Sequence, residues 1–178
     1  MKFIIASDLH GDKNYAEKIV QIFNNEKADK LILLGDIYNH GPRNRLPDGY
    51  SPMDVASVLN SVKDSLIVVK GNCDSQVDTM ISDFDFIEDM VVAVGGKTLF
   101  LTHGHVYNKD NLPKTKFDAI IYGHFHTGFI EEIDGKIFAN AGSLSLPKNG
   151  TKNSYLILDE FTLLLKEIDG EIITKINL

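Results

Sequence analysis

Five short apolar runs in this chain each end at a side chain that can bind a metal ion or move a proton, usually beside a glycine. The runs cover residues 2–7, 30–34, 66–69, 97–102 and 117–122. Continuous apolar runs of this length are typical of strands that are buried on both faces. Ligand sites in open α/β sheets lie beyond the carboxyl ends of the strands. The sequence therefore predicts buried sheets whose strand ends carry the chemistry.

The first half of the chain alternates such strands with helices. Residues 12–25 are expected to form a helix, because Tyr15, Ile19, Ile22 and Phe23 form an apolar stripe with helical spacing. A loop rich in Gly, Pro and Asn covers residues 39–52, and a short helix is expected near residues 53–61. This strand–helix–strand order predicts parallel βαβ units.

The second half is expected to be an antiparallel meander. Turn dipeptides at Gly95-Gly96, Asp134-Gly135 and Asp169-Gly170 separate short apolar segments. The predicted strands cover residues 90–94, 97–102, 129–133, 136–139, 154–158, 163–168 and 171–176. We expect an α/β protein in which two mixed sheets pack together with helices outside. No linker or repeat interrupts the chain, so residues 1–178 are expected to form a single domain.

Composition narrows the classes of function. The 178 residues include 18 Lys and Arg against 25 Asp and Glu, a formal net charge of −7. Binding to duplex nucleic acid depends on clustered Lys and Arg side chains, so we expect no duplex nucleic acid partner for this acidic chain. The single cysteine, Cys73, cannot form an internal disulfide, and no apolar stretch approaches the length of a membrane span. We expect a soluble, cytoplasmic protein without a membrane partner.

The polar residues after the strands form recognisable groups. Taken singly, an Asp-x-His, Gly-Asp or Gly-Asn pair is commonly an ordinary turn. In chain order the groups are Asp8-x-His10, Gly35-Asp36, Gly71-Asn72, His103-Gly104-His105 and Gly123-His124-x-His126. Five such groups at five strand ends indicate a metal site built from carboxylates, imidazoles and an amide.

This ordered set of motifs resembles that of the calcineurin-like metallophosphoesterases. The resemblance extends from Asp8 to Ser143, and the last matching motif is Asn140-Ala-Gly-Ser143. The short length and the tract from Asn39 to Asn44 resemble the small microbial phosphodiesterase branch, the YfcE type. The resemblance implies a four-layer α/β/β/α sandwich of two mixed sheets flanked by helices. It also implies a dinuclear metal centre at one sheet edge.

The resemblance further implies which residues hold the ions. The seven implied ligands are Asp8, His10 and His126 on one ion, Asn72, His103 and His124 on the other, and Asp36 bridging both. Such ligands suit Mn²⁺, the expected ion, as well as Zn²⁺, Fe or Ni²⁺. Two ions can lower the pKa of a bridging water, and the resulting hydroxide would attack phosphorus in line with the leaving group.

The remaining site residues are expected around this centre. Asp36 and Asn72 are expected to be catalytic through the ions they hold, and His105 by orienting His103 or the phosphate. Asn39, His40 and Arg43 follow Asp36 closely enough to border a small phosphodiester substrate. Arg43 in particular can clamp a phosphate oxygen, although a solvated turn is the alternative.

One position departs from the resemblance. Many relatives have His directly after the ligand Asn, and this imidazole is credited with protonating the leaving group. Here the position is Cys73, which leaves His40 and His105 as substitutes and Cys73 itself as a substrate neighbour or a buried filler. A thiol with a pKa of about 8.5 is a weaker acid than imidazolium.

Other functions stay open at this point. A phosphomonoesterase of the same fold would use the same ligands. A non-catalytic scaffold, such as the retromer subunit that this fold resembles, is another alternative. A scaffold would have no chemical reason to keep all seven implied metal ligands. Neither a G-x-G-x-x-G nor a G-x-x-x-x-G-K-[ST] motif supports nucleotide binding. The sequence leaves homo-oligomerisation open.

Overall fold

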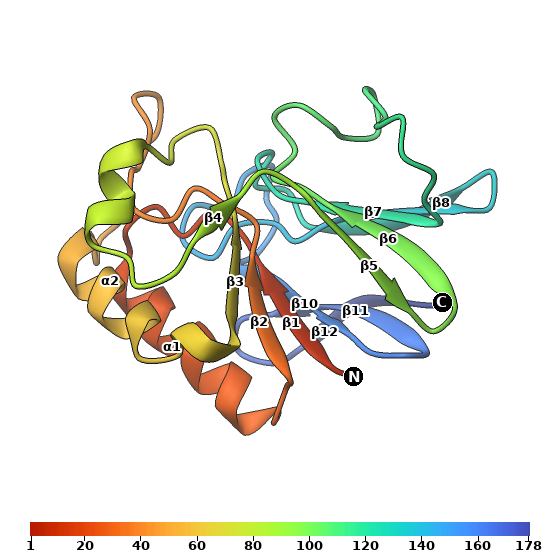
Figure 1. Ribbon diagram of the computed structural model, residues 1–178, viewed down its shortest axis with the longest axis horizontal. Coiled ribbons are helices and arrows are strands. Elements are labelled where there is room, and N and C mark those ends of the chain that lie inside the picture. Colours follow the sequence, from red (N-terminus) through yellow and green to blue (C-terminus); the bar gives the residue numbers. More distant parts are fainter.

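Two mixed β-sheets pack face to face in the computed structural model, which describes residues 1–178 (Figure 1). The strands of the larger sheet, in spatial order, are β12 (Ile172–Asn177), β11 (Thr162–Glu167), β10 (Ser154–Leu158), β1 (Phe3–Ala6), β2 (Lys30–Leu33), β3 (Leu66–Val69) and β4 (Phe86–Ile87). Strands β1 to β4 run parallel, and β10 joins β1 in antiparallel register. The parallel strands therefore all end at one edge of this sheet.

The smaller sheet has its own parallel centre. Its strands, in spatial order, are β5 (Met90–Val94), β6 (Lys97–Leu101), β7 (Ala119–Tyr122), β9 (Lys136–Asn140) and β8 (Phe129–Ile133). Strands β6, β7 and β9 are parallel, while β5 and β8 pair antiparallel at the two edges. The carboxyl ends of β6 and β7 carry the histidine motifs.

The apolar strands are continuous because they have cores on both sides. Ile4 and Ala6 of β1 face the two helices, whereas Phe3 and Ile5 face the second sheet. The helices are α1 (Lys13–Asn25), capped by Asp12, and α2 (Pro52–Asn60). Each fully buried Ile or Leu stabilises the fold by about 1.5–3 kcal/mol. Neither helix has the length and apolarity that crossing a bilayer would need.

The observed elements agree with the predicted two-sheet α/β fold, but two features differ. The second half is not a simple antiparallel meander, because β6, β7 and β9 are parallel: residues 102–118 cross over between β6 and β7, and β8 pairs on the outer side of β9. The second difference concerns the outer layers. Both helices lie against the larger sheet, on the left in Figure 1. The outer face of the smaller sheet is instead covered by Phe117 and Tyr107, which belong to the non-helical segment between β6 and β7. This segment has no apolar stripe of helical period, and two aromatic rings are enough to cover Ile120 and Phe138.

Smaller differences concern the strand and helix ends. The helix expected over residues 12–25 begins at Lys13, because Asp12 is its N-cap and accepts hydrogen bonds from the N–H groups of Asn14 and Tyr15. Short 3₁₀ turns at Lys63–Ser65 and Gln76–Met80 and the two-residue strand β4 were not expected. They are too short to produce a periodic pattern.

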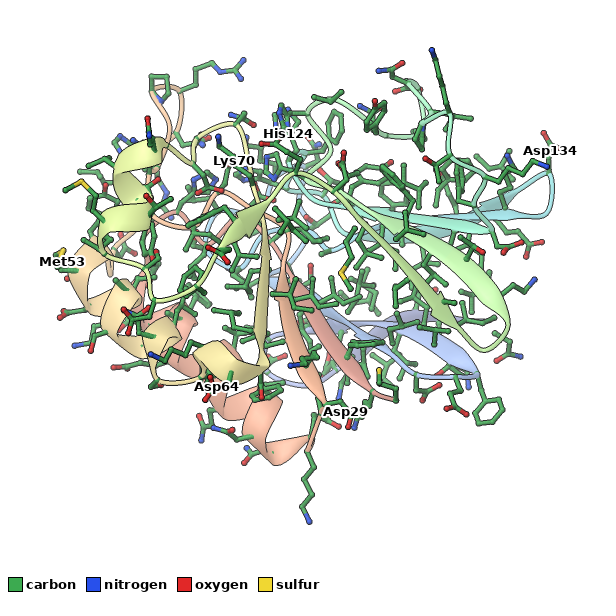
Figure 2. The ribbon with its side chains drawn as sticks, in the orientation of Figure 1. Asp29, Met53, Asp64, Lys70, His124 and Asp134 are labelled. Atoms are coloured by element: carbon green, nitrogen blue, oxygen red, sulfur yellow. The ribbon has the colours of Figure 1, made fainter.

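The two sheets bring the strand ends together at one end of the molecule. His124, after β7, lies near the top of Figure 2, whereas Asp29, just before β2, lies at the opposite end. The chain termini also lie away from His124, at the lower right of Figure 1. The polar turns that follow the parallel strands of both sheets thus face one region.

Candidate metal centre and phosphate site

The turns that carry the expected ligands have an unusual backbone. Five of these residues have positive φ angles: Asp8 (55°), His10 (50°), Asp36 (55°), His124 (65°) and His126 (59°). Such angles cost non-glycine residues about 1–3 kcal/mol each and persist only where the surroundings enforce them. The strain is therefore concentrated at the strand ends where the polar side chains converge.

Close packing explains two of the neighbouring glycines. A Cβ atom on Gly71 would lie 2.2 Å from Asp36 Oδ1, and one on Gly35 would lie 2.5 Å from the Gly71 nitrogen. A side chain at position 71 would push the Asp36 carboxylate out of place, and one at position 35 would collide with the backbone of Gly71 and the ring of His103. The glycines in the Gly-Asp and Gly-Asn motifs are thus needed for space.

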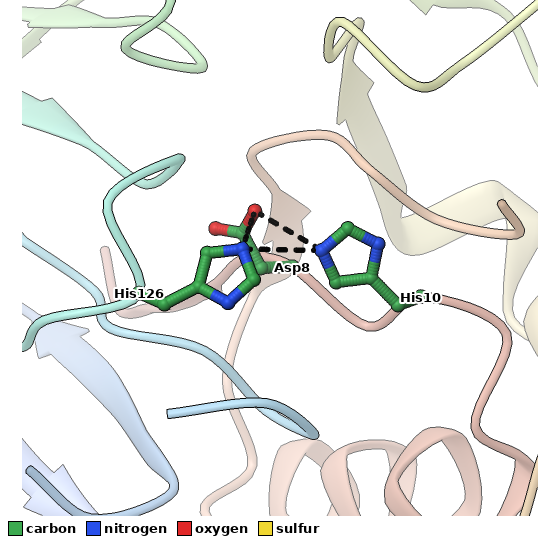
Figure 3. Close-up of side chains that lie close together, drawn as sticks. All are labelled: Asp8, His10 and His126. Carbon is green, nitrogen blue, oxygen red and sulfur yellow. Dashed lines mark hydrogen bonds and ion pairs between the residues drawn. The ribbon is translucent and has the colours of Figure 1, made fainter. Parts of the chain in front are cut away.

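The first cluster consists of Asp8, His10 and His126 (Figure 3). The Asp8 Oδ1 atom lies 3.7 Å from His10 Nε2 and 3.2 Å from His126 Nε2. The two Nε2 atoms themselves are 3.2 Å apart. All three side chains are buried, and their three ligand atoms converge on one small volume.

Hydrogen bonds orient the two imidazoles of this cluster. His10 Nδ1 donates to the carbonyl of Asn39 at 2.7 Å, and His126 Nδ1 donates to the carbonyl of Leu146 at 2.6 Å. With Nδ1 protonated, each neutral ring turns its Nε2 lone pair toward the cluster. Asp8 Oδ1 is buried without a hydrogen-bond partner. Two facing lone pairs and an orphaned carboxylate oxygen fit a bound cation, which would satisfy all three.

The second cluster consists of Asn72, His103 and His124. His103 Nε2 lies 3.1 Å from Asn72 Oδ1 and 3.3 Å from His124 Nδ1. His103 Nδ1 donates to the carbonyl of Leu34 at 2.6 Å, which again leaves Nε2 as the free nitrogen. Burial and the neighbouring His103 lower the pKa of His124 to about 4, so its ring is neutral near pH 7 and can act as a ligand.

Asp36 lies between the two clusters. Its Oδ2 atom is 3.8 Å from His10 Nε2, and its Oδ1 atom is 3.5 Å from His103 Nε2. The two oxygens of one buried carboxylate thus face two separate groups of nitrogen ligands. This is the arrangement that a carboxylate bridging two cations requires.

Other buried polar groups hold these residues in position. Asp74 accepts hydrogen bonds from the backbone N–H groups of Asp36, Ile37 and Gly71, at 2.7–2.8 Å. Ser143 Oγ donates to the carbonyl of Asp8 at 2.7 Å. These hydrogen bonds of Asp74 and Ser143 fix the turns that carry Asp36 and Asp8.

The charge states around the site follow from burial and from neighbouring charges. Burial raises the pKa of Asp8, but the neighbouring imidazoles of His126, His103 and His10 lower it more, to below its usual range. Burial and the charge of Asp36 raise the pKa of Asp74 to about 6, against the effect of its N–H donors. Asp8 is therefore a carboxylate at neutral pH, as a metal ligand must be.

A hollow of about 800 Å³ opens above the clusters. Its lining includes Asp36, Asn72 and His124 together with three of the expected substrate neighbours, Asn39, Arg43 and Cys73. The exposed Arg43 side chain forms no ion pair within the chain. A negatively charged phosphate above the clusters would therefore meet a free guanidinium.

Two expected residues lie elsewhere than in the lining of this hollow. The ring of His40 packs edge-on against Tyr50, with ring centroids 5.5 Å apart. His105 is exposed at the rim, with its ring centroid 5.3 Å from that of His103. No hydrogen bond orients either imidazole toward the hollow, so neither ring is positioned to donate a proton to a leaving group there.

Two lining residues were missed by the sequence interpretation. Lys148 reaches the hollow from the turn after Ser145, and the half-exposed Phe125 packs edge-on against His124 at 5.2 Å. Phe125 stands between two expected ligands, so its place in the Gly-His-Phe-His motif was a usable signal. Lys148 had no such signal, because its approach depends on the path of the loop after β9.

Cys73 borders the hollow as a neutral thiol. Its backbone N–H donates to Asp36 Oδ1 at 2.8 Å, and Asn72 Nδ2 lies 3.3 Å from its sulfur. Burial and the Asp36 carboxylate raise the pKa of Cys73 to about 12. A thiol with this pKa is neither a nucleophile nor a useful acid near neutrality.

Comparisons with known proteins identify the family of this site. The model of the calcineurin-like phosphoesterase superfamily domain matches residues 1–162. Phosphodiesterase YfcE of Escherichia coli (strain K12) is 44% identical over 166 residues, which cover 92% of this chain and 90% of that protein. The solved structure of Yfce, described as a phosphoesterase from E. coli, matches with a TM-score of 0.94 and 40% identity. That match covers 99% of this chain and 98% of the other.

A more distant likeness concerns the fold only. A Vps29 structure from Entamoeba histolytica matches with a TM-score of 0.66 at 19% identity, and it covers 100% of this chain and 99% of that chain. The family match and the 44% identity carry more weight, and they confirm the resemblance that the strand-end motifs indicated. The chain belongs to the calcineurin-like phosphoesterase superfamily, and it is a hydrolase of phosphate esters.

Proposed function

We propose that this protein hydrolyses small phosphodiesters at a centre that holds two divalent metal ions, with Mn²⁺ as the expected ion. The observation that carries the proposal is the position of Asp36. Its two carboxylate oxygens face His10 on one side and His103 on the other, at 3.8 and 3.5 Å. The phosphodiesterase name of the E. coli relative supports the choice of a diester.

Seven side chains would hold the ions. Asp8, His10 and His126 would bind the first, Asn72, His103 and His124 the second, and Asp36 both. Bound divalent ions would supply activation of water and polarisation of the phosphoryl group. The hydrogen bonds on Nδ1 of His10, His103 and His126 hold the rings so that little reorganisation is needed on binding.

The substrate phosphate would lie in the hollow beside the clusters. Arg43 and Lys148 both line it and form no ion pair within the chain, so both are free to contact non-bridging phosphate oxygens. Arg43 can do so with two N–H groups, which favours a defined orientation of the phosphate. His105, at the rim beside His103, would orient His103 or the outer part of the substrate.

Charge favours a diester over a monoester. The hollow offers two cationic side chains besides any bound ions, and it also contains Asp36. A phosphomonoester brings two negative charges near neutral pH, whereas a diester brings one. We therefore expect the diester to be the better substrate, and a monoester preference is the competing outcome of the test.

The test combines metal content with turnover. The protein is stripped with a chelator, reconstituted with Mn²⁺ and desalted. Elemental analysis is expected to approach two ions per chain, and bis(4-nitrophenyl) phosphate to be hydrolysed with a higher kcat/KM than 4-nitrophenyl phosphate. Metal content that stays near zero would overturn the proposal. A higher kcat/KM for the monoester would replace it with a phosphomonoesterase.

A further inference from the structure

A second hollow adjoins the one above the metal clusters. It encloses about 660 Å³ and is lined by the start of α1, the loop from Arg43 to Asp48 and the turn from Ser145 to Lys148. Only two of its 12 lining residues are hydrophobic. The hollow is therefore suited to a polar group and poorly suited to an acyl chain or an aryl ring.

The two hollows share one ridge. Arg43, Asn44 and Lys148 line both of them. Because the two cations stand on this ridge, a phosphate that lies in the first hollow can contact them and extend one ester group into the second hollow. One side of the ridge leads to the clusters around Asp36, and the other leads to the second hollow.

The charges that belong to the second hollow alone argue against a second phosphate there. These residues are Asp12, Arg45 and Asp48, with a combined charge of 1 − 2 = −1. Arg45 lies 3.5 Å from Asp48 and is already paired. A further anionic group would face a slightly negative wall, whereas a neutral group would pay no such penalty.

The uncharged side chains of this hollow offer both donors and acceptors. Asn153 uses Nδ2 to donate to the carbonyl of Leu144, which leaves its Oδ1 as an acceptor. The side chains of Asn14 and Tyr15 form no hydrogen bond within the chain. Burial, Asp12 and Asp48 raise the pKa of Tyr15, so the phenol keeps its proton and can donate. Hydroxyl groups, which donate and accept, match such a lining.

We propose that the substrate is a phosphodiester in which one ester alcohol is a neutral, hydroxyl-rich group, and that the second hollow binds this alcohol. The proposal rests on the function proposed above and names the substrate class of the same site. Arg43 and Lys148 would hold the phosphate in the first hollow, and Asn14, Tyr15 and Asn153 would bind the hydroxyl groups in the second.

The test is a comparison of affinities in the Mn²⁺-loaded protein, measured by calorimetry. The probes are bis(2,3-dihydroxypropyl) phosphate and dipropyl phosphate, which differ only in their hydroxyl groups. Each carries the same alcohol on both sides, so the result does not depend on the orientation of the ester. Two or more new hydrogen bonds are expected to make the hydroxylated probe bind about tenfold more tightly.

Single substitutions test which residues cause the preference for the hydroxylated probe. Asn14→Ala and Tyr15→Phe are each expected to reduce the preference for the hydroxylated probe by about threefold, the effect of one neutral hydrogen bond. Asn24→Ala, on the exposed side of the same helix, is the control and should keep the full preference. Tyr15→Phe removes only the hydroxyl group, which guards against a folding defect.

The outcomes separate the two proposals. Equal affinity for the two probes, or no binding of either, would overturn the assignment of the second hollow. So would a preference that survives in both variants. Turnover of bis(4-nitrophenyl) phosphate, measured on the same preparation, tests the proposed function separately. A hydroxyl preference without turnover would keep the binding site and reject the hydrolase mechanism.

Discussion

The Asp74 carboxylate anchors the main chain of Asp36. Its Oδ2 accepts the N–H of Asp36 at 2.8 Å and that of Gly71 at 2.7 Å, while Oδ1 accepts the N–H of Ile37 at 2.8 Å. One buried side chain therefore ties the turn after β2 to the turn after β3. These two turns carry Asp36 and Asn72, so their separation depends on Asp74.

Replacement of Asp74 should weaken metal binding without removing any ligand. In Asp74→Asn the amide NH₂ would face backbone N–H groups, and at least one buried donor would lose its acceptor. We expect Mn²⁺ affinity to fall by about 10- to 100-fold, as for other residues that orient metal ligands. Titration of the stripped protein with Mn²⁺ measures it.

The control for this variant is Asp85→Asn, at an exposed position that does not line the hollow. Circular dichroism of both stripped proteins would show whether the fold is kept. If Asp74→Asn binds Mn²⁺ as tightly as the parent, the turn after β2 is held by other contacts and the anchoring role of Asp74 is rejected.

The sheets were largely predictable because their strands carry strong local signals. Strand β1 is apolar at every position, since Ile4 faces the helices and Ile5 faces the second sheet. The Asp134-Gly135 turn places β8 beside β9 in the expected register. The layer over the smaller sheet was less predictable, because Phe117 and Tyr107 cover it from an irregular segment.

The chemistry of the site was predictable only in part. The polar residues at the strand ends indicated a metal site, but the division of ligands between two ions came from the family resemblance. Contributions from loops could not be foreseen, as Lys148 shows. His40 was expected to border the substrate because it is near Asp36 in sequence, but its ring packs against Tyr50 instead. Short sequence separation does not determine where a loop side chain points.

The bridging position of Asp36 predicts a joint loss of both ions. Asp36→Asn keeps the size of the side chain but removes the charge that both clusters share. We expect metal content to fall well below two per chain and turnover of bis(4-nitrophenyl) phosphate to fall by at least about 100-fold. Elemental analysis and steady-state kinetics measure the two quantities.

The stripped Asp36→Asn protein should remain folded, because the buried apolar side chains between the sheets stabilise the fold without metal. Asp110→Asn, exposed and outside the hollow, is the matched control. Turnover near the parent value in Asp36→Asn would mean that this carboxylate belongs to an ordinary turn.

Arg43 should contribute through the geometry of its guanidinium as well as its charge. Loss of a charge-assisted contact to the phosphate costs about 1.5–3 kcal/mol, so Arg43→Ala should lower kcat/KM for the aryl diester by about 10- to 100-fold. Arg43→Lys should also be impaired, since Lys cannot donate two parallel hydrogen bonds. Metal content should be unchanged in both variants.

Lys114→Ala provides the control, because this exposed cation lies outside both hollows. Parent-like kinetics in Arg43→Ala would place the guanidinium in solvent. A loss of bound metal in the same variant would instead point to a structural role for the loop, and the phosphate clamp would be rejected.

Cys73 should affect reactivity through its place beside the phosphate rather than by giving a proton. Its raised pKa, about 12, keeps the thiol protonated and makes it a poor acid at neutral pH. Nitrophenolate leaves without protonation, so Cys73→Ser should keep aryl-diester turnover within about threefold of the parent.

Cys73→His would introduce an imidazole with a pKa near 6.5, which suits proton donation. It should help alkyl esters, whose alkoxides are poor leaving groups, more than aryl esters. The measurement is the slope of log(kcat/KM) against the pKa of the leaving group, expected to be shallower for Cys73→His than for the parent. If Cys73→Ser loses aryl-diester hydrolysis while both metal ions stay bound, the thiol acts in the reaction and the account of a missing acid at this position fails.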